Sequence, residues 1–111
     1  MFEDLKKIPE LSSIKDNNNF YEASFNKENI LKLFQELKNS ELFSFDQLID
    51  ITAIDYPSRE KRFELIYIFL SMKKNMRIIL RTSIEENDNL YSITNIFKAA
   101  DWYERECYDL F

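Results

Sequence analysis

The side chains of this sequence that are best suited to chemistry lie near its C-terminal end. Cys107 is the only cysteine, and a thiol becomes a nucleophile once it is deprotonated. The acidic neighbours Glu106 and Asp109 oppose thiolate formation, and the chain has no histidine to accept the proton. A stand-alone enzyme that uses Cys107 is therefore the weakest of the hypotheses weighed below.

Charged residues around Cys107 are spaced for ion pairing along a helix. Asp101 and Asp109 lie four residues on either side of Arg105, so one guanidinium can reach two carboxylates. On a solvated helix face such pairs contribute only about 0.3–0.5 kcal/mol each. The spacing still predicts that Arg105→Ala lowers stability or assembly more than Lys38→Ala, because no pattern requires a partner for Lys38.

The composition excludes several kinds of site. Without glycine there is no phosphate-binding glycine loop, and without histidine there is neither a catalytic triad nor a histidine metal ligand. One cysteine cannot by itself hold an iron–sulfur cluster or a structural zinc. These absences favour a binding or scaffolding domain, and they leave Asn, Asp, Ser and Pro to form the turns.

The overall totals indicate one domain, residues 1–111, with a core of its own. The chain is 45% hydrophobic and contains 10 Phe and 6 Tyr. Its net charge of -5 argues against nucleic acid or an anionic membrane surface as a direct partner. No apolar run approaches the roughly 20 residues of a membrane span. A lone cysteine favours a reducing, cytosolic setting.

Apolar periodicity predicts an α+β fold with a mixed sheet of about four strands and helices packed on it, in the order α-β-α-β-β-β-α. The first helix is expected within residues 1–11, and a second, capped by Asn26, is expected to run to about Lys38. The expected strands are residues 20–25, 48–55, 63–70 and 76–84. If the first two strands are parallel neighbours, they form a βαβ-like unit with the helix between them.

The last helix is expected to begin after Ser92, which would cap it. Its apolar residues recur at three- and four-residue steps, with Glu104 beside them: Ile93, Ile96, Phe97, Ala100, Tyr103, Cys107 and Leu110. The helix runs to Leu110 and Phe111 without a glycine cap. Because the last carbonyls and the ring need cover, we expect that the native chain continues or that a partner covers this end.

A second apolar segment lies in the connection before the second expected strand. Leu42, Phe43 and Phe45 either pack under the sheet, which is the ordinary outcome, or form an exposed contact patch.

Several segments together resemble the 30-kDa subunit family of respiratory complex I, the NADH-quinone oxidoreductase. The family signature is Glu-Arg-Glu, two free residues, an acid and two apolar residues, and it matches residues 104–111. Residues 48–57, 62–67 and 99–103 also fit, in the same order. Family members continue with a glycine-containing segment and a basic, histidine-containing stretch, so this sequence lacks the C-terminal part of the family.

The resemblance implies a cofactor-free scaffold subunit of the hydrophilic arm of a proton-translocating NADH-quinone oxidoreductase, which supports electron transfer from NADH to quinone. The implied partners are the quinone-site subunit and the subunit that carries the terminal iron–sulfur cluster. Flavin, iron–sulfur clusters and quinone would lie in partner subunits, and no catalytic or metal-binding residue is expected in this chain. The chain would be peripheral, on the cytoplasmic side of the inner membrane, through the complex.

The resemblance also carries over a set of interface and signature residues: Trp102, Glu104, Arg105, Glu106, Asp109, Leu110 and Phe111. The charged members are expected to order the helix and to dock a neighbour, and the apolar members are expected to anchor it. Alternatively, Asp101 or Asp109 simply holds Arg105 within the chain.

Two further functions remain open at this point. One is the equivalent subunit of a membrane-bound hydrogenase or formate hydrogenlyase, docked on a nickel–iron subunit. Residues 55–57 and 62–64 incline the assignment to the quinone oxidoreductase. The other is an isolated adaptor whose acidic helix docks on a basic patch, which strong salt dependence of binding would support.

Overall fold

The computed structural model describes residues 1–85, 88 and 91–109, with only the backbone of Tyr108 and Asp109. Its elements are α1 (Phe2–Leu5), β1 (Leu11–Asp16), β2 (Phe20–Phe25), the 3-10 helix η1 (Lys27–Asn29), α2 (Ile30–Asn39), β3 (Gln47–Asp55), β4 (Phe63–Ser71), β5 (Met76–Ile84) and α3 (Ala100–Asp109). One mixed sheet of five strands has the order β1-β2-β5-β4-β3. The α+β class is confirmed, with one strand more than expected.

The additional strand is β1, in a region where the pattern predicts a helix. The helix within residues 1–11 ends after Leu5, and Leu11 instead pairs with Phe25 of β2. Leu11 is the only buried residue of β1, and the pairing register shifts between Ser12 and Lys15. A bulged, largely exposed edge strand has little two-residue periodicity, so its sequence carries almost no strand signal.

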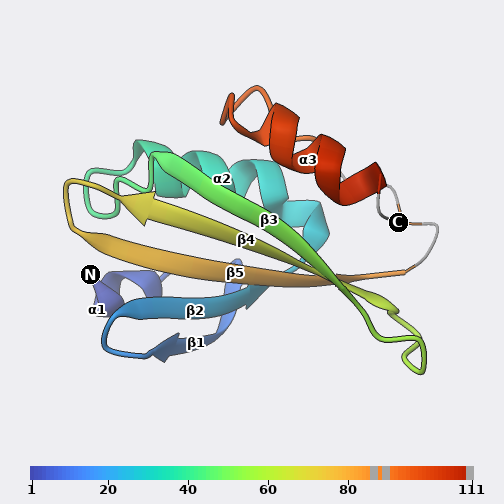
Figure 1. Cartoon of the computed structure of the whole chain (residues 1–111). Coiled ribbons are helices and arrows are strands. Elements are labelled where there is room, and N and C mark those ends of the chain that lie inside the picture. Colours follow the sequence, from blue (N-terminus) through green and yellow to red (C-terminus); the bar gives the residue numbers. More distant parts are fainter. Residues whose placement is uncertain (86–87, 89–90, 110–111) are drawn as a thin grey trace.

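The sheet combines one parallel pair with three antiparallel pairs. β2 is parallel to β5, while β1–β2, β4–β5 and β3–β4 are antiparallel. The βαβ-like unit required β2 and β3 to be parallel neighbours. It does not form, because β3 lies at the edge of the sheet opposite β1. The chain crosses the helical face through α2 and returns through the β3–β4–β5 meander (Figure 1).

The core lies between the sheet and the helices α2 and α3, which occupy the same face (Figure 1). Asn26 caps η1 by accepting the Glu28 N–H at 3.0 Å, and α2 follows directly. The predicted stripe of α2 is buried throughout: Ile30, Leu33, Phe34 and Leu37. The Phe34 ring lies edge-on to Phe25, Tyr67 and Phe69, with centroids 4.9–5.3 Å apart. This aromatic cluster fixes α2 on the sheet.

The connection from α2 to β3 turns two of its apolar side chains into the core. Phe43 and Phe45 are buried, as the packed alternative predicts, while Leu42 remains 56% exposed. Two of the three apolar residues therefore belong to the core.

Four described residues other than glycine have a positive φ: Ser13, Asn18, Ser44 and Asn75. Serine and asparagine thus take these special positions, Ser13 at the irregularity within β1 and the other three in turns and loops, as the lack of glycine requires. Among the described residues, no helix is long and apolar enough to cross a membrane.

Candidate protein interface on the C-terminal helix

Helix α3 packs on the sheet beside β3 and presents its other side to solvent (Figure 1). Ala100 and Cys107 are buried in the core, with Tyr103 partly buried against it. On the opposite side of the helix, Trp102 is 60% exposed, and Asp101, Arg105 and Glu106 are exposed as well. The helix therefore divides into an apolar inner side and a polar outer side that carries the only tryptophan.

The helix begins at Ala100, eight residues after the predicted cap Ser92. The preceding residues form a separate turn in which the N–H groups of Ile96 and Phe97 both donate to the carbonyl of Ile93 at 2.9 Å. The predicted inward side chains are nevertheless buried at Ile93, Ile96 and Phe97. The apolar spacing was thus informative about burial but wrong about a continuous helix.

A tertiary contact explains the break. In a continuous helix the Ala100 N–H would donate to the carbonyl four residues earlier, that of Ile96. Here the Lys38 Nζ donates to that carbonyl at 2.5 Å, and the Ala100 N–H donates to the Phe97 carbonyl at 3.0 Å. The Lys38 ammonium also lies 5.3 Å from the centroid of the Phe97 ring. The end of α2 thus holds the turn before α3 in place.

Glu104 holds the same turn from the other side. Its side chain is buried, and its Oε2 accepts the Ile93 N–H at 2.9 Å. Its Oε1 accepts the Ser92 hydroxyl at 2.6 Å and the Thr94 hydroxyl at 3.3 Å. Ser92 therefore does not cap α3 but binds a carboxylate that α3 supplies. The three donors to this buried carboxylate are one backbone N–H and two hydroxyls of the same chain, so its burial is compensated by hydrogen bonds.

Sequence reasoning missed the structural roles of Lys38 and Thr94, and it gave Ser92 a different role, that of a helix cap. Their role depends on contacts across 10 to 58 positions of the chain, which periodicity does not register. The serine and the threonine on either side of Ile93 were the available signal, since such hydroxyls often bond to nearby backbone groups.

The ion pair around Arg105 is solvent-exposed. Arg105 Nη2 lies 3.2 Å from Asp101 Oδ2, and both side chains are about 65% exposed. The Asp109 side chain, and Leu110 and Phe111 entirely, fall outside the described residues, so their predicted contacts are not addressed by the structure. Lys38, for which no pattern requires a partner, makes the longer-range and better buried contact of the two cations.

Cys107 is buried in the core. Burial, reinforced by the nearby carboxylates of Asp50 and Glu104, raises the pKa of its thiol. A buried thiol with a raised pKa is a poor nucleophile. The geometry therefore argues against an enzyme that uses Cys107 as its nucleophile.

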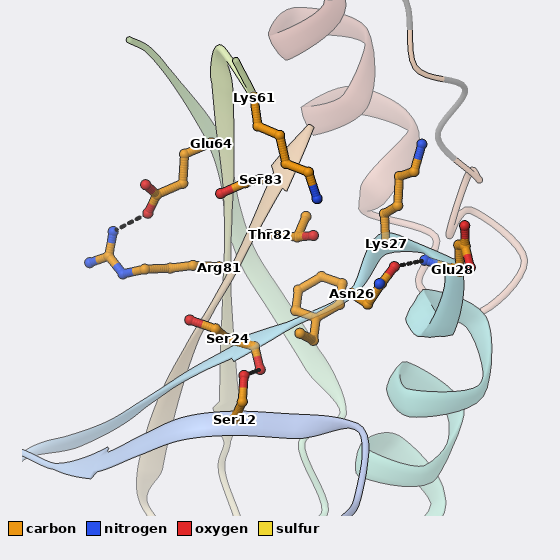
Figure 2. A pocket seen from close by; sticks show the side chains of 11 residues that line it. Ser12, Ser24, Asn26, Lys27, Glu28, Lys61, Glu64, Arg81, Thr82 and Ser83 are labelled. Atoms are coloured by element: carbon orange, nitrogen blue, oxygen red, sulfur yellow. Dashed lines mark hydrogen bonds and ion pairs between the residues drawn. The ribbon is translucent and has the colours of Figure 1, made fainter. Parts of the chain in front are cut away.

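A hollow of about 410 Å³ opens at the end of the β2–β5 pair (Figure 2). Its charges are largely neutralised within the chain: Arg81 donates to Glu64 at 3.1 Å, and Lys27 Nζ lies 2.7 Å from Asp88. Across residues 1–85, 88 and 91–109, no three His, Cys, Asp or Glu side chains cluster as metal ligands would. The outer side of α3 is therefore the stronger candidate site.

Comparison with known proteins gives consistent matches. The family model described as respiratory-chain NADH dehydrogenase, 30 Kd subunit, matches residues 23–111. A subunit of the NADH-quinone oxidoreductase of Ruegeria pomeroyi is 47% identical over 83 residues, which cover 75% of this chain and 42% of that protein. The same subunit of a Jannaschia species is 52% identical, covering 68% of this chain and 36% of that protein.

A mitochondrial relative and a solved structure extend the match to nearly the whole chain. NADH dehydrogenase [ubiquinone] iron-sulfur protein 3 of Candida albicans is 42% identical over 96% of this chain and 37% of that protein. A chain of the archaeal membrane-bound sulfane sulfur reductase superposes with a TM-score of 0.83 at 25% identity, covering 98% of this chain and 64% of that one. The sequence thus spans 36–42% of the length of these curated relatives.

Proposed function

Because this chain belongs to the 30-kDa subunit family of the respiratory-chain NADH dehydrogenase, we propose that it is a scaffold subunit of a proton-translocating NADH-quinone oxidoreductase. In this role it performs no chemistry itself. It supports electron transfer from NADH to quinone by holding neighbouring subunits of the hydrophilic arm in position.

The observation that carries the proposal is the outer side of α3. Trp102 is 60% exposed beside the Asp101–Arg105 pair. A tryptophan and an arginine on one exposed surface are typical of interface hot spots. The surface is also preorganised, because Glu104 and Lys38 fix the turn that precedes the helix. A preorganised surface loses less freedom on binding than a mobile one.

The partners and cofactors follow from the same proposal. The outer side of α3 docks the quinone-site subunit or the subunit that carries the terminal iron–sulfur cluster. Flavin, iron–sulfur clusters and quinone lie in those partners, which fits a chain with no histidine and one buried cysteine. The chain is peripheral, on the cytoplasmic side of the inner membrane, through the complex. Glu106, Asp109, Leu110 and Phe111 keep their predicted places in the interface.

The second candidate is the equivalent subunit of a membrane-bound hydrogenase or formate hydrogenlyase. This candidate is considered because the structural neighbour comes from a different respiratory membrane complex, that of an archaeon. Its 25% identity, against 47% and 52% for the quinone oxidoreductase relatives, favours the latter.

The test is affinity purification of the tagged full-length protein from its own membranes, with identification of the co-purifying subunits and an assay of NADH-quinone activity. Recovery of flavin- and iron–sulfur-containing subunits with that activity supports the proposal. Recovery of a nickel–iron subunit instead selects the second candidate. Recovery of neither, with binding lost as salt rises, selects the isolated adaptor.

The contact surface is tested in the same preparation with Trp102→Ala. The matched control is Leu42→Ala, a similarly exposed apolar residue in the connection between α2 and β3. Trp102→Ala is expected to lower recovery of the partner subunits while Leu42→Ala leaves it unchanged. Equal recovery from both variants would remove α3 from the docking surface.

A further inference from the structure

Strand β4 is apolar on both of its faces. Leu65, Tyr67 and Phe69 point into the core and are buried. Because side chains alternate along a strand, Ile66, Ile68 and Leu70 lie on the opposite face. A strand that is apolar on both faces is normally covered on both.

The described helices all lie on the core face. α2 and α3 occupy one side of the sheet (Figure 1). The Phe2 ring of α1 stacks on Tyr21 with centroids 5.7 Å apart, and Tyr21 belongs to the same core. Within the described part of the chain, no helix therefore covers the second face of β4.

The apolar residues of this second face form a continuous strip, which we call the open-face strip: Ile66, Ile68 and Leu70 of β4 and Ile79 of β5. Ile68 lies directly opposite Ile79 in the sheet register. Neighbouring side chains cover Ile66 to 9% exposure, while the other three remain partly exposed. Three alternate residues of β4 span roughly 13 Å, counted from the first side chain to the last. That length matches a little over two turns of an α-helix, about 11–13 Å.

Basic residues border the strip. Arg81 lies opposite Ile66 and Arg77 lies opposite Leu70. Lys15 of β1 is the register partner of Glu22 of β2, and Glu22 lies opposite Ile79 of β5. The strip therefore has cations along its β5 side.

Not all of the cations beside the strip are paired. Arg81 is neutralised by Glu22 at 3.2 Å and Glu64 at 3.1 Å, and it extends from the sheet away from α2 (Figure 2). Arg77 and Lys15 form no ion pair with any described residue. The β5 side of the strip thus carries two cations without an ion-pair partner in the described part of the chain, while Asp50 of β3 lies opposite Ile68 on the other side.

We propose that the open-face strip docks an amphipathic helix of another protein, with the apolar side of that helix on the strip and acidic residues beside Arg77 and Lys15. A helix layer on the second face completes a three-layer arrangement, which is how a sheet with two apolar faces is normally buried. The acidic flank is set by charge complementarity. Together with the outer side of α3, the strip gives the chain docking surfaces on opposite faces of the sheet, so the chain lies between two partners.

The first test measures thiol accessibility at the border of the strip. Cys107 is buried, so an Arg77→Cys variant has one accessible thiol. The control is Lys73→Cys, exposed in the β4–β5 turn outside the strip. Labelling by a maleimide is compared between the isolated full chain and the assembly purified through a tag. We expect Arg77→Cys to lose its labelling in the assembly relative to Lys73→Cys. Equal labelling of Arg77→Cys in both preparations would overturn the proposal.

The second test uses the unmodified protein and so does not depend on how a variant folds. A zero-length carbodiimide reagent links Lys15 to a carboxylate in direct contact. In the assembly we expect a link from Lys15 to an acidic residue of another protein, within a segment of amphipathic helical pattern. Links confined to Lys15 and its own chain would contradict the proposal.

Two outcomes separate this inference from neighbouring ones. If the isolated chain is a dimer in which Arg77→Cys is already protected, the occupant is a second copy and the proposal is overturned. If the assembly lacks NADH-quinone activity, the proposed function fails, while protection of Arg77→Cys in that assembly still supports the open-face strip.

Discussion

Lys38 donates its ammonium proton to the carbonyl oxygen of Ile96 at 2.5 Å and thereby joins the end of α2 to the turn that precedes α3. Lys38→Ala is expected to lower the free energy of unfolding by about 1.5–3 kcal/mol, because it removes a charged hydrogen bond from a part-buried site. Arg105→Ala should change it by no more than about 0.5 kcal/mol, because its ion pair is exposed. Urea unfolding of the two variants checks the order. A larger loss from Arg105→Ala would restore the expectation based on spacing.

Glu104 should be among the most sensitive positions of α3. Glu104→Ala leaves the buried Ile93 N–H without its acceptor, and we expect a loss of about 1–3 kcal/mol in the free energy of unfolding. Glu106→Ala, two residues along and exposed, is the matched control and should stay within about 0.5 kcal/mol. The measurement is chemical denaturation at neutral pH. Similar values for the two variants would mean that Glu104 does not hold the turn.

The thiol of Cys107 should be protected in the folded chain. Burial raises its pKa, so the thiolate is disfavoured until the pH exceeds the ordinary value for a thiol. Stability linked to the neutral thiol is present below that value and is lost as pH rises through the raised pKa. Alkylation at pH 8 should therefore be slow in buffer and fast in urea. Equal rates in the two solutions would contradict the burial of this side chain.

Acid should weaken the β3–β4 hairpin through Asp55. Arg62 donates to both oxygens of this carboxylate, at 2.7 and 2.9 Å, and the Arg62 hydrogen bonds hold the pKa of Asp55 below its ordinary value of 3.8. Its contribution to stability is therefore present above that value and is lost as pH falls through the lowered pKa.

Asp55→Asn tests this contribution. The variant should unfold more easily than the parent at pH 7, and the difference should shrink as the pH falls below 3.8. Thermal unfolding across this range measures the difference, with Glu60→Gln in the adjoining turn as the control. A difference that stays constant with pH would exclude the ion pair as its source.

Local patterns were sufficient for the elements with strong periodicity. β2 and β5 match their predicted bounds, and α2 buries all four residues of its predicted stripe. β3 and β4 each extend one residue beyond their expected bounds. β1 was missed because only Leu11 of its residues is buried. The parallel pairing of β2 with β5 follows from the topology of the whole sheet, and the residue pattern of neither strand predicts it.

The site was predictable in position but not in detail. The spacing of apolar residues placed Cys107 inside and left Trp102 outside, as the structure has them. The start of α3 was wrong because Lys38, far away in the sequence, takes the Ile96 carbonyl. The spacing placed Glu104 beside the apolar stripe, but it did not show that the Glu104 carboxylate binds Ser92, Ile93 and Thr94. The docking role of the signature residues stays a prediction.

The turns and the irregularity of β1 are built without glycine, with Ser13, Asn18, Ser44 and Asn75 at positive φ. An L-residue in that region is strained by roughly 1–2 kcal/mol, although asparagine tolerates it better than most. The same residues restrict the unfolded chain more than glycine would. This loss of freedom in the unfolded chain stabilises the folded protein by about 0.4–1 kcal/mol per position. Strain in the native turns and a less disordered unfolded state thus oppose each other, so glycine substitutions at these corners should have small net effects that differ in sign between serine and asparagine.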